Sequence, residues 1–146
     1  TTHDQRGSDI YGEAVNDEFG WSIAMSRDGE TIAVGARYND GGGSNSGSAR
    51  VLVWNGTTHD QRGSDIDGEA ADDWFGSSIA MSGDGETIAV GARYNDGGGS
   101  KSGSARVFVW NGTTHDQRGS DIYGEAVNDE FGWSIAMSRD GETIAV

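Results

Sequence analysis

Residues 19–36 read FGWSIAMSRDGETIAVGA, and the pattern of this stretch predicts the fold. Residues 22–26 are expected to form a strand with large apolar side chains on one face and a small one on the other, because side chains alternate along a strand. Asp28-Gly29 then marks a hairpin turn. The TIAVGA stretch at 31–36 is apolar on both faces, which is typical of a strand buried between two layers.

The sequence that follows supplies two more strands. Residues 37–47 (RYNDGGGSNSG) are rich in Gly, Asn and Ser and indicate a loop. SARVLVW at 48–54 predicts a third strand, and Asn55-Gly56 predicts a two-residue turn after it. HDQRGSDI then predicts a fourth strand that is polar up to its isoleucine. Each unit is therefore expected to be a four-stranded antiparallel meander with one polar outer strand.

This unit recurs with a period of 56 residues, because TTHDQRGSDI occurs three times in the chain. The units are repeat A at 1–56, repeat B at 57–112 and a partial repeat A at 113–146. The partial copy is identical to the first 34 residues. Repeats A and B differ at eight positions: Tyr11/Asp67, Val15/Ala71, Asn16/Asp72, Glu18/Trp74, Trp21/Ser77, Arg27/Gly83, Asn45/Lys101 and Leu52/Phe108.

The differences at Glu18/Trp74 and Trp21/Ser77 together describe one exchange of side chains. Repeat A has Glu18 and Trp21, whereas repeat B has Trp74 and Ser77, so the indole moves by three positions and a small residue stands in its former place. One interpretation is a larger unit of an A–B pair, since large-for-small exchanges at facing positions allow layers to interdigitate. The other is drift between recent duplicates.

The composition excludes several classes of protein. The formal net charge of −14 disfavours nucleic acid and anionic lipid as partners, because both are bound through Lys and Arg. No apolar run approaches the length of a membrane span. The chain has no Cys, which excludes disulfides and thiol catalysis, and its 25 Gly fit many short strands joined by turns.

Four-stranded sheets repeated in tandem predict an all-β fold of the β-propeller type. At this period 146 residues correspond to about 2.6 blades, fewer than a closed propeller needs. Three explanations are open: an excerpt of a longer array, a subunit that closes a ring with copies of itself, or a segment of an open filament. In the first case a longer chain completes the blades, and in the other two cases oligomerisation completes them.

The stretch from Phe19 to Gly56 resembles the FG-GAP type of propeller repeat, which is found in the head of integrin α chains and in many algal and bacterial surface proteins. The resemblance rests on Phe19-Gly20, on TIAVGA in place of the family's LLVGAP, and on a glycine-rich loop before a strand that ends in an aromatic residue. It implies a propeller fold and an extracellular or cell-surface location.

The resemblance also implies a place to look for calcium, between the first two strands. Many members carry a D-x-D-x-D-G loop there, but this chain has SRDGET or SGDGET. Calcium takes six to eight oxygen ligands, and the acids of one such hairpin are too few. We therefore expect no metal or other cofactor, and calcium is left open only at a site that adds Asp17 or Asp40 from the loops. The acids concerned are Asp28, Asp84 and Asp140, with Glu30, Glu86 and Glu142 nearby.

No catalytic residue is predicted. His3, His59 and His115 each precede an Asp, but adjacent residues of a strand point to opposite faces and cannot form a catalytic pair. Glycan binding is a second possibility, through residues on the long loops, where binding residues gather: Tyr38, Asn39, Asp40, Tyr94, Asn95 and Asp96. Asn55 and Asn111 lie in N-x-[ST] sequons and are candidate glycosylation sites in a secreted protein.

These features predict a non-enzymatic, extracellular structural repeat protein that forms a scaffold, filament or adhesive assembly with copies of itself. Near-identical repeats suit such a role because every interface is the same. The alternative is a glycan-binding or adhesion propeller that uses its loops. An engineered repeat protein is a third interpretation, since repeat copies this similar are also typical of designed sequences.

Overall fold

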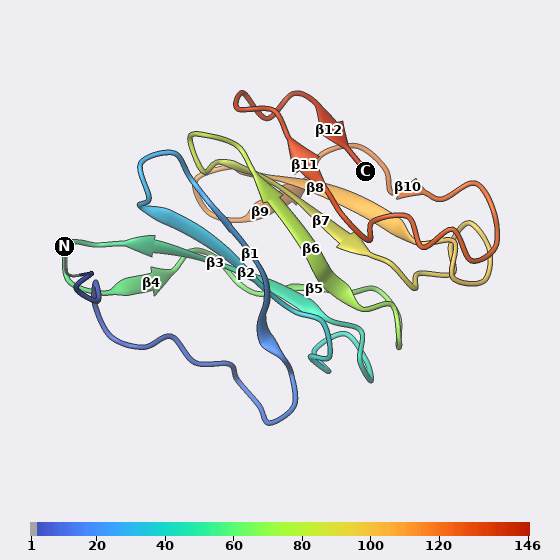
Figure 1. Ribbon diagram of the computed structural model, residues 1–146, viewed down its shortest axis with the longest axis horizontal. Coiled ribbons are helices and arrows are strands. Elements are labelled where there is room, and N and C mark those ends of the chain that lie inside the picture. Colours follow the sequence, from blue (N-terminus) through green and yellow to red (C-terminus); the bar gives the residue numbers. More distant parts are fainter. Residues whose placement is uncertain (1–2) are drawn as a thin grey trace.

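The computed structural model describes residues 3–146, and in this range the chain forms strands and turns without a helix (Figure 1). Thr1 and Thr2, which belong to the first predicted outer strand, lie outside the described residues. The first sheet has the order β1-β2-β3-β4, and β5 also pairs with β3. Its strands are β1 (Phe19–Met25), β2 (Thr31–Ala36), β3 (Ser48–Trp54), β4 (His59–Gln61) and β5 (Ile66–Asp67).

The second sheet repeats this arrangement 56 residues later, and a shorter strand pair follows it. The sheet contains β6 (Phe75–Met81), β7 (Thr87–Ala92), β8 (Ser104–Trp110), β9 (His115–Gln117) and β10 (Ile122–Tyr123). The third strand pair is β11 (Ala136–Met137) and β12 (Ile144–Ala145). All strand pairs within the sheets are antiparallel, so the all-β, blade-like architecture is confirmed.

The first strand of each sheet begins earlier than predicted. β1 begins at Phe19, and the register shifts between Phe19 and Ser22, which marks a β-bulge. The bulge contains Gly20 at a φ of 92°, a conformation that glycine adopts without strain. The pattern-based start at residue 22 was wrong because the irregular pairing at the bulge hides the alternation of side chains.

The predicted fourth strand is divided in two. β4 pairs with the end of β3 and β5 with its beginning, and residues 62–65 between them bulge out around Gly63. In the first copy, residues 3–10 form no strand at all, contrary to the prediction. The reason is that an outer strand needs an inner strand to pair with, and this segment loops around the edge of the first sheet instead (Figure 1).

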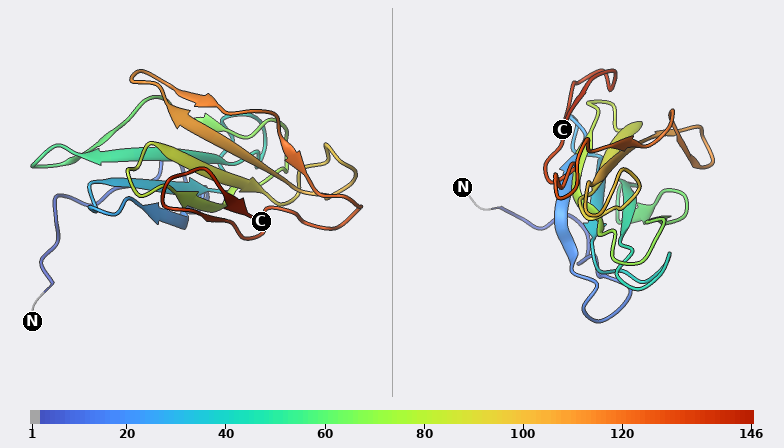
Figure 2. Two further views of the ribbon diagram at one scale, coloured as in Figure 1. Left: turned by 90° about the horizontal axis from the view of Figure 1, so that it is seen from above. Right: turned by 90° about the vertical axis from the view of Figure 1, so that its right-hand side faces the viewer.

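The core lies between the two sheets, which stack face to face (Figures 1 and 2). The first sheet contributes its small face, formed by Ala24, Ala33, Ala49 and Val51. The second sheet contributes its large face, formed by Ile79, Ile88, Val90 and Phe108, with Phe75 beside them. Large side chains thus pack on small ones, as layers at native packing density require.

A hydrogen bond from a serine hydroxyl to a backbone carbonyl joins neighbouring repeats at two equivalent positions. The hydroxyl of Ser22 donates to the carbonyl of Gly76 at 2.7 Å, and the hydroxyl of Ser78 donates to that of Gly132 at 2.6 Å. Beside these bonds lie Gly35 and Gly91, where a Cβ would collide with the same carbonyl oxygens. Glycine therefore allows each sheet to approach its neighbour at backbone distance.

Candidate functional site

The long loop between β2 and β3 is held by a buried asparagine. The side-chain amide nitrogen of Asn39 donates to Asp17 at 2.8 Å, and its oxygen accepts from the backbone nitrogen of Gly41 at 2.8 Å. Both Asn39 and Asp17 are buried. The loop of repeat B is built in the same way, since Asn95 donates to Asp73 at 2.8 Å. The amides of Asn39 and Asn95, two predicted ligand-binding groups, are thus engaged within the protein.

The aspartates of these loops are exposed and only partly engaged. One carboxylate oxygen of Asp40 accepts from the backbone nitrogen of Asn45 at 2.7 Å, and Asp96 accepts from that of Lys101 at the same distance. These bonds close the loops, as Asp side chains commonly do in turns. Each of these bonds uses one carboxylate oxygen, so the second oxygen of each aspartate takes no part in closing the loop.

The two predicted tyrosines lie on either side of one tryptophan. The ring of Trp74 is 4.8 Å from that of Tyr38 and 4.3 Å from that of Tyr94, measured between centroids. The structure therefore brings the two loops together through a residue of repeat B. Such edge-to-face and tilted ring pairs stabilise the packing beyond the area they bury.

Arginines continue this cluster into a column of alternating aromatic and cationic groups. The guanidinium of Arg37 lies between the rings of Trp21, at 3.2 Å, and Trp74, at 5.0 Å. Arg93 lies between Trp74, at 4.8 Å, and Trp133, at 4.2 Å. Each contact is a cation–π interaction. The column crosses both junctions between sheets, so it ties all three repeats together.

The arginines differ in their ionic partners. The Nε of Arg37 donates to Glu18 at 2.7 Å. In repeat B, Trp74 occupies the position that Glu18 has in repeat A. The buried Nε of Arg93 has no hydrogen-bond partner among the described residues. The exchange of Glu for Trp thus replaces an ion pair by aromatic packing at this position.

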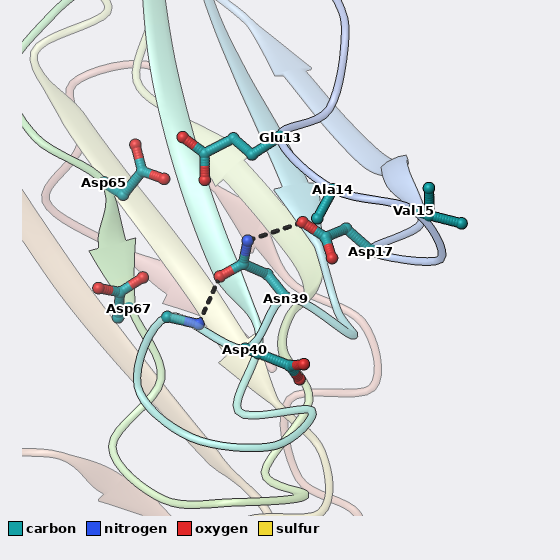
Figure 3. Close-up of a pocket in the computed structure, with 9 residues that line it drawn as sticks. Glu13, Ala14, Val15, Asp17, Asn39, Asp40, Asp65 and Asp67 are labelled. Atoms are coloured by element: carbon teal, nitrogen blue, oxygen red, sulfur yellow. Dashed lines mark hydrogen bonds between the residues drawn. The ribbon is translucent and has the colours of Figure 1, made fainter.

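An acidic hollow of about 430 Å³ lies beside the first long loop (Figure 3). Glu13 from the N-terminal segment and Asp65 and Asp67 from the outer edge of the first sheet point towards it. The pKa of Glu13 is raised, chiefly by its hydrogen bond with the side chain of Asp65 and further by burial. Like charges held this close favour sharing of a proton.

No metal centre is formed in residues 3–146 by three or more His, Cys, Asp or Glu side chains. At the hairpin of each repeat, the aspartate serves the turn itself. Asp28 accepts from the hydroxyl of Ser26 at 2.6 Å and from the backbone nitrogen of Glu30 at 3.0 Å. The pKa of Asp28 is lowered by these two bonds, that of Ser26 first. The same bonds recur at Asp84 and Asp140.

The histidines of the outer strands pack against tryptophans. His59 lies opposite Trp54 in the register, with 4.9 Å between ring centroids, while Asp60 accepts from Asn55 and Thr58. The imidazole and the carboxylate of this His-Asp pair therefore have separate partners. In the second sheet His115 packs on Trp110 at 4.8 Å, and burial lowers its pKa to about 4, with Arg62 adding to the effect.

The two sequons lie in exposed loops at the end of β3 and β8. Residues 55–58 connect β3 to β4, and the backbone nitrogen of Asn55 donates to the carbonyl of Thr58 across Gly56 and Thr57, so the turn is centred one residue later than the predicted Asn55-Gly56. Of Asn55 and Gly56 only Gly56 has a positive φ. The Asn55 amide nitrogen donates to Thr58 and Asp60, and Asn111 makes the equivalent bonds. Glycosylation of these residues stays a prediction.

Tandem blade-like antiparallel sheets with glycine-rich loops define a repeat protein of the propeller class. The sequence matches the FG-GAP repeat over residues 11–52 and 59–108, and the chain belongs to this family. A comparison with curated proteins finds no match. Among the described residues, no helix is both long and apolar enough to cross a membrane.

Sequence reasoning missed one cavity beside the aromatic cluster. It has a volume of about 320 Å³ and is lined by Ala71, Asp72, Trp74, Tyr94, Asp96, Ser100 and Lys101. The signal that could have found it was present in the sequence, because four of these positions differ between repeats A and B. The sequence pattern alone suggests packing between layers or drift as the reason for the exchange at Trp74, and neither interpretation predicts a cavity.

Proposed function

We propose that this chain is a non-enzymatic, extracellular structural protein whose blade-like sheets stack into a scaffold or filament. The observation that carries the proposal is the repetition of one junction. The same serine hydroxyl, glycine contact and arginine column join the first sheet to the second and the second to the third strand pair. Junctions built on one plan allow an array to be extended without a new type of interface for each unit.

The exposed faces at the two ends of the stack support self-association. The large face of the first sheet leaves Trp21, Ile23 and Met25 more than half exposed. On the third strand pair, Ala136 and Ala145 are exposed and correspond to the small face of the first sheet. These faces are the two halves of the junction already formed inside the chain, so the partner we propose is a second copy stacked in the same register.

Association can be tested by sedimentation at several concentrations of the full chain, with electron microscopy of the particles. We expect a mass that rises with concentration, and Ile23→Arg or Ala136→Arg should each block one end. A mixture of the two variants should then stop at a dimer. The control is Thr57→Arg, which changes an exposed residue at the turn between β3 and β4, outside both faces. A mass that stays monomeric at every concentration would contradict the proposal.

The extracellular location is supported by the typical occurrence of FG-GAP repeats in surface proteins. Expression through the secretory route of a eukaryotic cell would test it together with the sequons. We expect a mass increment that a glycosidase removes and that Asn55→Gln with Asn111→Gln abolishes. Secretion of a folded chain without any increment would retain the location and reject the glycosylation.

Glycan binding is a second candidate function, favoured by one observation. Tyr94 and Asp96, both predicted as ligand-binding residues, line the same cavity as Trp74. Aromatic rings and carboxylates that converge on a hollow are the usual elements of a small-molecule site. A glycan array probed with the full chain tests this function, and binding lost on Tyr94→Ala would support it.

A further inference from the structure

The differences between repeats A and B are concentrated at one cavity. Four of the eight differing positions, namely Ala71, Asp72, Trp74 and Lys101, contribute to its wall. The remaining wall residues, Tyr94, Asp96 and Ser100, are common to both repeats. Drift would scatter substitutions along the exposed strands and loops. Their concentration at this hollow indicates that repeat B has acquired a site there.

The aromatic wall of the cavity is built by repeat B. Trp74 stands where repeat A has Glu18, at a φ of 59°, and its ring lies 4.3 Å from that of Tyr94. Both rings are partly exposed. In repeat A the equivalent position is filled by a carboxylate that is ion-paired with Arg37 at 2.7 Å, so no aromatic wall exists there.

Polar groups surround this wall. The ammonium of Lys101 lies 4.7 Å from the centre of the Tyr94 ring. One oxygen of Asp96 accepts from the backbone nitrogen of Lys101, and one oxygen of Asp72 accepts from the amide of Asn45 at 3.0 Å. These bonds fix both carboxylates and leave each a second oxygen as an acceptor. The cavity therefore presents two carboxylate acceptors and one ammonium donor beside two aromatic rings.

This combination matches the chemistry of a sugar. The C–H face of a pyranose packs on aromatic rings, its hydroxyl groups donate to carboxylates, and its oxygens accept from an ammonium group. An anionic ligand would meet two carboxylates in a chain of net charge −14. We propose that this cavity of repeat B binds a neutral mono- or disaccharide. The proposal rests on the candidate glycan-binding function and assigns it to one repeat of each A–B pair.

The binding test uses the full chain and a defined set of probes: the methyl glycosides of glucose, galactose and mannose, N-acetylglucosamine and lactose. Chemical shifts of labelled protein report the site. We expect at least one sugar to shift the indole N–H signal of Trp74 and the amide signal of Lys101. Tetramethylammonium is the competing probe, and its binding in place of every sugar would overturn the assignment of the ligand class.

Variants that convert one repeat into the other locate the site. Trp74→Glu with Ser77→Trp, and separately Lys101→Asn, give repeat B the residues of repeat A, and we expect at least tenfold weaker binding from either change. Val15→Ala, Asn16→Asp, Glu18→Trp with Trp21→Ser, and Asn45→Lys together form the reverse conversion, which should create a second site and raise the stoichiometry from one to two. Arg27→Gly is the matched control, because it also converts a repeat position but lies at the hairpin.

The outcomes separate this proposal from the functions on which it rests. If no probe binds, both the site and the candidate glycan-binding function are wrong, while sedimentation still decides on self-association. If a sugar binds with equal affinity to all converted variants, glycan binding stands but its place in this cavity is refuted. Retained far-UV circular dichroism and a cooperative urea unfolding transition of each variant show that it is folded.

Discussion

The first and second sheets contain the same SIAMS segment in different surroundings. Ile79 of β6 is 8% exposed, whereas its equivalent Ile23 of β1 is 61% exposed. The strand pairing is the same, since each isoleucine lies opposite a valine of the next strand. The difference arises because the first sheet covers the large face of the second, whereas among the described residues no sheet is stacked on β1, although Val34 and Leu52 on the same face are buried. Stacking, and not sheet formation, therefore buries the core.

This comparison means that each sheet is stabilised mainly by its neighbour. A single sheet of this kind would leave one face of large apolar side chains in water, and burial of such a side chain contributes about 1.5–3 kcal/mol. Equivalent substitutions in the two sheets should consequently differ in effect although the sequence around them is the same.

The largest expected difference is between Ile79→Ala and Ile23→Ala. Ile79 belongs to the buried core between the sheets. Its truncation should therefore cost about 2–5 kcal/mol, the range for deleting a large core side chain. The change at the exposed Ile23 should cost under about 0.5 kcal/mol. Urea unfolding at a concentration where the chain is monomeric by sedimentation measures both. Equal losses would show that the two faces are equally covered and would contradict the comparison.

A smaller effect is expected at the glycine junctions. Gly35 faces the carbonyl of Gly76, and a methyl group there has no room without moving the second sheet. Gly35→Ala should therefore cost about 1–3 kcal/mol, as overpacking does. Gly91→Ala meets the carbonyl of Gly132 in the same way, but the short β11–β12 pair can move more easily. We expect a smaller loss for Gly91→Ala in the same unfolding experiment, and the reverse order would refute this account of the junctions.

The strands of the core could be predicted from the sequence because their physics is local. TIAVGA is apolar on both faces, and β2 is indeed covered on both sides. The all-β class and the stacking of large on small faces follow from the same pattern. The polar outer strand has no such pattern, so its division into β4 and β5 was not predictable, and neither was the loss of this strand before β1.

The candidate site was harder to predict, because it depends on backbone conformations that composition does not reveal. Glu18 and Trp74 have φ values of 55° and 59°, a region that residues with large side chains rarely adopt. This conformation aims Trp74 at the two tyrosines. The loop sequence predicts Tyr94 and Asp96 as binding residues, but only the fold shows that Trp74 and Lys101 line the same cavity.

The smallest of these effects is a dependence of stability on pH. His115 lies beside Trp110 and near Gly63 of the first sheet, and neither ring nitrogen has a hydrogen-bond partner in the described chain. Burial lowers the pKa of His115 from 6.5 to about 4. Between these values the unfolded chain binds the proton and the folded chain does not, so stability falls as the pH decreases through this window.

The ring of His115 is only half-buried, so solvent screening reduces the effect, and we expect a loss of about 1 kcal/mol between pH 7 and pH 5. His115→Gln should remove this loss, because glutamine does not titrate. Gln117→Asn, a neutral change on the same strand, should leave it in place. Urea unfolding at the two pH values decides the matter. An unchanged pH dependence in His115→Gln would mean that stacking on the first sheet does not exclude the proton from this ring.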